Sequence, residues 1–147
     1  SVFPRVLPYI AMSRSPYAME EVMSAEGGRS IELQVVNKAS EEFVIFSAML
    51  PESGCQWIDG EQAKVGMTLK PGGSTTWGVA SPSTSATAIA EVRLKGDKGS
   101  SIGFEFKNLY NDLSLVEVEL SPKINYDIQP AATGLQTTCK VIITSLA

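Results

Sequence analysis

The chain has 147 residues, of which 44% are hydrophobic and 19% are charged, and its formal net charge is −4. This length and composition are typical of one globular domain with its own apolar core, and they exclude a disordered chain. The acidic balance, with no two Lys or Arg residues in succession, argues against a nucleic-acid partner, because such binding needs clustered positive charge. No apolar run approaches the roughly 20 residues that span a bilayer, so we expect no transmembrane segment.

Residues 1–28 are predicted to form an N-terminal arm with one short helix. Ser15 is a suitable N-cap, Pro16 fits the first helical position, and Gly27-Gly28 would end the helix. The helix is too short to be stable alone in water, so we expect it to pack on the domain. The same arm is a candidate contact for a homo-oligomer.

Residues 29–147 are predicted to form a single all-β domain, a β-sandwich of about eight strands. The run IELQVV (31–36) alternates apolar and polar residues, as a strand with one buried face does. The run FVIFSAML (43–50) is apolar at almost every position and is predicted to be a central buried strand. Further strands are predicted in STTWGVAS, LVEVEL, KINYDI and CKVIITSL.

The clearest hairpin in the sequence is AIAEVRLKGDKGSSIGFEFK. Its inward positions are predicted to face each other across the GDKG turn, with Ala90, Val92 and Leu94 opposite Ile102, Phe104 and Phe106. In the following run LVEVEL, Glu117 and Glu119 are predicted to point outward.

Enzymatic chemistry finds little support in the sequence. Histidine is absent, which removes the commonest general base and the commonest transition-metal ligand. Glu117 and Glu119 share a strand face, as the two carboxylates of a glycosidase do, but the solvent-facing side of an amphipathic strand explains them more simply. We therefore expect a non-enzymatic protein without a cofactor or a metal site.

The two cysteines, Cys55 and Cys139, lie far apart in the chain and lack the spacing of a metal site. They are interpreted either as one disulfide that closes a long loop or as two buried thiols. A disulfide would favour a secreted, extracellular protein.

A binding site is predicted at the loop KNLYNDLS, where the alternation on both sides is interrupted. Asn108, Tyr110, Asn111 and Asp112 would offer one aromatic ring among hydrogen-bonding side chains, and Trp77 is predicted to lie nearby. Such a surface suits a lipid headgroup or a sugar. The simpler interpretations are that Trp77 fills the core and that the loop residues only form a turn.

The order of elements resembles the actinoporins. The run EVMSAEGGRSIELQVVNKAS resembles their N-terminal helix followed by a strand, and MTLKPGGSTTWGV resembles their strand, Pro/Gly turn and aromatic strand. The run ATAIAEVRLKGDKGSSIGFEFKNLYNDLS resembles their hairpin and phosphocholine-binding loop, of which only Tyr110 keeps an aromatic residue. The same order, with a final strand like CKVIITSL, resembles the aegerolysins and related mushroom lectins.

This resemblance implies a secreted sandwich that recognises a membrane lipid headgroup or a glycan, as a cytolysin-like toxin does. An alternative is a secreted fungal effector or toxin that binds a host protein through its surface loops. A third interpretation is a subunit that oligomerises through its arm.

Overall fold

The computed structural model describes residues 3–9, 12–13, 28–109, 113–129 and 132–146. In this part of the chain thirteen strands are present and no helix. In chain order they are β1 (Phe3–Tyr9), β2 (Met12–Ser13), β3 (Ser30–Lys38), β4 (Phe43–Met49), β5 (Gln56–Trp57), β6 (Thr68–Leu69), β7 (Ser74–Ala80), β8 (Ala88–Gly96), β9 (Ser101–Asn108), β10 (Ser114–Leu120), β11 (Ile124–Gln129), β12 (Ala132–Thr133) and β13 (Gln136–Ser145).

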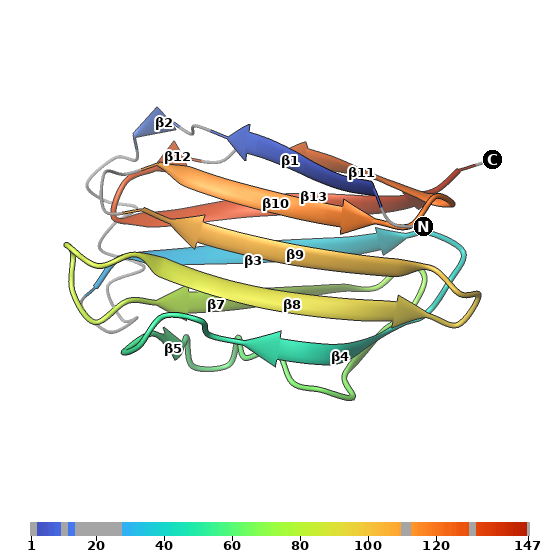
Figure 1. Ribbon diagram of the computed structural model, residues 1–147, viewed down its shortest axis with the longest axis horizontal. Helices are drawn as coiled ribbons and strands as arrows, with labels where there is room; N and C mark the ends of the chain where they lie inside the picture. The colour runs from blue at the N-terminus through green and yellow to red at the C-terminus, as the bar shows by residue number, and fades with distance from the viewer. Residues whose placement is uncertain (1–2, 10–11, 14–27, 110–112, 130–131, 147) are drawn as a thin grey trace.

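The strands form two stacked sheets (Figure 1). The six-stranded sheet has the order β1-β10-β9-β8-β4-β6, and the five-stranded sheet has the order β11-β13-β3-β7-β5. A short parallel pair, β12 and β2, lies beside them. The predicted fold class, an all-β sandwich, is confirmed.

Register within the six-stranded sheet agrees with the predicted hairpin. In the pairing of β8 with β9, Val92 is aligned with Phe104 and Leu94 with Ile102. Glu117 and Glu119 of β10 point outward, because the residues that alternate with them are buried. The alternation of these sequences therefore predicts both the pairing and the facing of these strands.

The core lies between the two sheets and consists of the inward side chains of both. Trp77 of β7 is its largest fully buried side chain. Its ring contacts that of Phe104 across the sandwich, with centroids 6.1 Å apart and planes tilted by 59°. This tilted arrangement is favourable for aromatic pairs, and it fixes the spacing of the sheets at their centre.

The prediction for residues 43–50 is wrong in one respect. Strand β4 is second from the edge of its sheet, beside the two-residue strand β6. Phe43 and Ile45 are buried, whereas Val44 and Phe46, which alternate with them, are exposed. The run is continuously apolar because β4 has one core face and one apolar face toward solvent.

Part of the N-terminal segment belongs to the sandwich. Strand β1 pairs with β10 along its whole length and forms the other edge of the six-stranded sheet. The helix predicted to begin after Ser15 falls in residues 14–27, outside the described residues. Within the described ranges, no helix is long and apolar enough to cross a membrane.

Candidate functional site

Exposed apolar side chains are concentrated at one edge of the six-stranded sheet. Six large hydrophobic residues are exposed among those whose side chains the structure describes, and five of them lie on β4 or just before β6. We call these five the edge patch: Val44, Phe46, Met49, Val65 and Met67. Such clustering marks a contact surface, whereas single exposed hydrophobic residues are ordinary.

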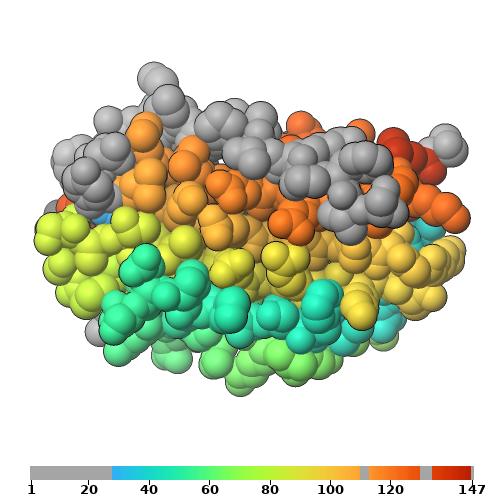
Figure 2. Space-filling view, viewed as in Figure 1, coloured from blue at the N-terminus to red at the C-terminus, as the bar shows by residue number. Residues whose placement is uncertain are grey.

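Backbone hydrogen bonds hold the two parts of the edge patch together. The amide of Ile45 donates to the carbonyl of Met67 at 2.9 Å, and the amide of Gly66 donates to the carbonyl of Ile45 at 2.8 Å. The segment that carries Val65 and Met67 therefore runs directly beside β4. In Figure 2, which shows the outer face of the six-stranded sheet, β4 lies near the lower rim of that face.

Lysines accompany the edge patch. The Nζ atom of Lys95, on neighbouring β8, lies 5.0 Å from the centroid of the Phe46 ring. Lys64 is exposed and immediately precedes Val65, and its backbone amide donates to the sulfur of Met67 at 3.2 Å. An aromatic ring, flexible methionines and flanking ammonium groups are the combination that favours a membrane interface.

The rest of this outer face is different in character. On β8–β10 several outward charges form ion pairs: Arg93 contacts Glu119 at 3.1 Å, and Lys107 contacts Glu105 at 3.0 Å and Glu117 at 3.6 Å. Glu117 and Glu119 thus act as ion-pair partners on the solvent-facing side of the sheet. Among the residues of β4 and β8–β10, the exposed large apolar side chains lie on the β4 side.

Trp77 does not belong to a surface site. Its side chain is 1% exposed and packs against Phe104 in the core. The expectation that Trp77 contacts a ligand is therefore corrected: a ligand at the surface does not reach this ring. The simpler interpretation, an aromatic residue between the sheets, describes its position.

Asn108 is also buried, and its side chain has a structural role. Its Nδ2 donates to the carbonyl oxygens of Ser30 at 3.0 Å, Gly134 at 2.9 Å and Leu135 at 3.2 Å. Its Oδ1 accepts from Arg29 Nη1 at 3.3 Å. These bonds tie the end of β9 to the opposite sheet, so the amide is not available to a ligand.

The remaining residues of the predicted loop site, Tyr110, Asn111 and Asp112, lie outside the described residues. Their role stays a prediction.

Cys55 and Cys139 are both free thiols, which agrees with the thiol interpretation and not with the disulfide. Cys55 is half-buried, and its Sγ donates to the carbonyl of Thr87 at 3.4 Å. Cys139 lies in the core, where burial raises the pKa of its thiol to about 11. Within the described residues, no group of three or more Cys, Asp or Glu side chains is arranged to hold a metal ion.

The fold defines the protein as a β-sandwich. No family model matches the chain, and no curated protein matches it. Among solved structures, the chain is similar to the crystal structure of lipid binding protein Nakanori, with a TM-score of 0.63 and 10% sequence identity over 88% of this chain and 77% of that one. At this level of identity, the similarity concerns the fold.

Proposed function

We propose that this protein binds membrane lipid without catalysing a reaction, and that the edge patch is the surface that meets the lipid. The observation that carries this proposal is the concentration of exposed apolar side chains on β4 and residues 65–67. A solved protein with the same fold is a lipid binding protein, which supports the same class of partner here.

The composition of the edge patch favours a membrane surface over a buried protein interface. Phe46 and Met67 would enter the boundary between headgroups and acyl chains, while Lys64 and Lys95 would remain level with the lipid phosphates. Full burial of one such apolar side chain contributes about 1.5–3 kcal/mol, so a half-exposed one contributes roughly 1 kcal/mol on docking. Several together suffice for reversible binding.

Vesicle flotation tests this proposal. The full chain would be mixed with vesicles of phosphatidylcholine and cholesterol, of sphingomyelin and cholesterol, and of phosphatidylcholine with phosphatidylserine. We expect flotation of the wild type with at least one composition. Phe46→Ser and Val65→Ser should each lower the vesicle partition coefficient by about fivefold or more, since each removes roughly 1 kcal/mol of apolar contact.

Leu146→Ser is the matched control, because the exposure of Leu146, 51%, lies between those of Phe46 (43%) and Val65 (67%), but Leu146 lies outside the edge patch. It should float like the wild type. Sedimentation velocity without lipid tests the alternative that another copy of the chain covers the edge patch. If the protein forms a dimer that Phe46→Ser dissociates, and no vesicle floats it, the edge patch is a self-association surface and not a lipid-binding one. If all variants float equally, the edge patch is not the lipid-binding site.

A further inference from the structure

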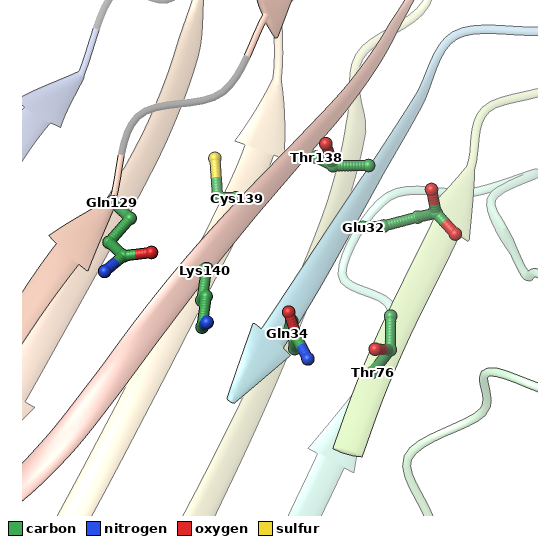
Figure 3. Close-up of a pocket in the computed structure, with 7 residues that line it drawn as sticks. All are labelled: Glu32, Gln34, Thr76, Gln129, Thr138, Cys139 and Lys140. Atoms are coloured by element: carbon green, nitrogen blue, oxygen red, sulfur yellow. The ribbon is translucent and has the colours of Figure 1, made fainter. Parts of the chain in front are cut away.

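A polar groove crosses the outer face of the five-stranded sheet (Figure 3). Its volume is about 410 Å³, and its polar lining consists of Glu32, Gln34, Thr76, Gln129, Thr138 and Lys140. These side chains come from four strands, β3, β7, β11 and β13. No aromatic residue is among the described residues that line it. The groove lies on the opposite outer face of the sandwich from the edge patch.

One end of the groove is acidic. Glu32 is aligned with Thr138 of β13 and with Gly78 of β7. Because Gly78 has no side chain, the carboxyl group of Glu61 occupies the space above it, where a Cβ atom would collide with Glu61 Oε1 and lie 2.8 Å from Ile58 Cδ1. Glu32, which lines the groove, therefore forms a carboxyl pair with Glu61, which lies beside this end and outside the lining.

The carboxyl pair has unused hydrogen-bonding capacity. Oε1 of Glu61 is buried and has no hydrogen-bond partner among the described residues. Burial, the hydrogen bond with Glu32 and the negative charge of Glu32 raise the pKa of Glu61 to about 8. Glu61 thus keeps its proton at neutral pH. Buried polar atoms without partners are rare, and this one lies outside the groove lining, so a ligand in the groove meets the negative charge that the pair leaves on Glu32.

The other end of the groove is basic. Lys140 is aligned with Gln34 of β3 on one side and with Gln129 of β11 on the other. Gln34 is in turn aligned with Thr76 of β7. Lys140 forms no ion pair with another described residue. An ammonium group flanked by two carboxamides and a hydroxyl provides several donors for an anionic oxygen.

Opposite charges at the two ends determine the class of ligand. A carboxyl pair binds a primary ammonium group through charge-assisted hydrogen bonds, and Lys140 binds a carboxylate or a phosphate. A quaternary ammonium group has no N–H to donate and is recognised mainly by aromatic rings. Among the described residues, the groove lining provides acceptors and no ring, so it favours the primary group.

We propose that the groove binds a small zwitterion, with its primary ammonium group at the Glu32 carboxylate, which Glu61 backs, and its carboxylate or phosphate at Lys140. The ligand class is argued from the groove alone, whereas the assignment to a free ligand rests on the proposed function of the edge patch. A single flat membrane cannot contact both outer faces of the sandwich, so a protein docked through the edge patch leaves the groove open to solvent. We therefore assign the groove to a ligand that is free in solution rather than to a headgroup within a bilayer.

Chemical-shift titration of the ¹⁵N-labelled full chain tests the ligand class. The probes are 4-aminobutanoate and O-phosphoethanolamine, each compared with its trimethylammonium analogue of equal length, and with ethanolamine and inorganic phosphate alone. We expect saturable shifts of the amides of Gln34, Thr76 and Lys140. A zwitterion with a primary ammonium should bind about tenfold more tightly than its trimethylated analogue or than either half alone.

Two variants test the assigned ends. Lys140→Gln and Glu32→Gln keep the size and polarity of the side chain but remove its charge, and each should weaken binding of the zwitterion about tenfold. Lys38→Gln is the control, because Lys38 lies on the same strand as Glu32 and is exposed but does not line the groove. It should bind like the wild type. Thermal unfolding midpoints verify that each variant is folded.

Three results would overturn the proposal. The first is the absence of shifts in the groove with every zwitterion. The second is binding that Lys140→Gln and Glu32→Gln leave unchanged, or that the trimethylated analogues match. The third is perturbation of the groove by phosphatidylethanolamine vesicles alone, which would transfer the site from a free ligand to a membrane lipid.

Discussion

Lys95 holds its ammonium group over the ring of Phe46, with Nζ 5.0 Å from the ring centroid. The contact joins the aromatic residue of the edge patch to a cation on neighbouring strand β8. At an exposed site it contributes about 0.5–1 kcal/mol, too little to account for the exposure of the ring by itself. A role at a phosphate-bearing surface explains both side chains together.

We expect Lys95→Met to weaken binding to anionic vesicles about fivefold, because one lysine near such a surface contributes about 1 kcal/mol. Binding to zwitterionic vesicles should change little, since the apolar stem of the side chain is kept. Flotation at low and high salt measures both effects. Lys123→Met, an exposed lysine in the turn before β11, is the control and should leave binding unchanged. An equal loss with both vesicle types would contradict the electrostatic role.

Glu61 should make the stability of the protein fall as pH rises across the neutral range. Its pKa is about 8 in the folded chain, against an ordinary value of 4.5. Between these values the folded state holds a proton that the unfolded state has released, so the free energy of unfolding decreases with pH. Water around this half-buried carboxyl reduces the size of the effect, so the prediction concerns the sign of the slope.

Urea unfolding at about pH 5.5 and about pH 8.5 measures this slope. The wild type should have the higher midpoint at the lower pH, and Glu61→Gln, which cannot ionise, should lose most of the difference. Glu117→Gln, on the outer face of the other sheet, should keep it. A slope that persists in Glu61→Gln would assign the effect to another group.

Gly78→Ala should destabilise the protein by about 1–3 kcal/mol, because the new methyl group would collide with Glu61 and with Ile58 Cδ1. Gly103→Ala is a suitable comparison: its methyl would meet only the flexible end of Arg93, at 3.2 Å, and should be tolerated better. Adding Glu61→Ala to Gly78→Ala should recover part of the loss. Urea midpoints give all three values, and equal losses at both glycines would show that the carboxyl above Gly78 is not the cause.

The sequence predicts the pairing of β8 with β9 because strict alternation and a glycine turn are local features. It does not reveal that one face of β4 is exposed, since a strand with one apolar face toward solvent has the same apolar sequence as a strand buried on both faces. The edge patch was therefore missed. The only sequence signal was the placement of Val65 and Met67 in a polar, glycine-containing segment.

The groove could not be predicted for a different reason. It depends on the parallel pairing of β3 with β13, which brings Glu32 and Gln34 beside Thr138 and Lys140 from the opposite end of the chain. Each strand alone shows ordinary outward polar residues. Only the register of distant strands places charges of opposite sign at two ends of one groove.

Asn108→Ala should cost about 2 kcal/mol or more of unfolding free energy. It removes donors to the carbonyls of Ser30, Gly134 and Leu135 and leaves the Arg29 guanidinium without one of its acceptors. Asn108→Asp is the informative companion, because it keeps the acceptor for Arg29 but places oxygen atoms against carbonyl oxygens. It should be destabilised at least as much at neutral pH. If Asn108→Asp were as stable as the wild type, the cross-sheet donors would not be what stabilises this junction.

The two thiols should differ sharply in reactivity. Cys55 is half-buried, whereas Cys139 is 3% exposed and has a pKa of about 11, so little of the reactive thiolate of Cys139 is present or reachable at about pH 8. A thiol-specific chromogenic reagent should modify about one thiol per chain in the native protein and both in urea. Cys55→Ser should remove the native reaction and leave the reaction in urea at one thiol. A chain with no reactive thiol in urea before reduction, and two after it, would instead contain the disulfide. Its urea midpoint would then fall on reduction, because the loop between Cys55 and Cys139 would no longer be closed.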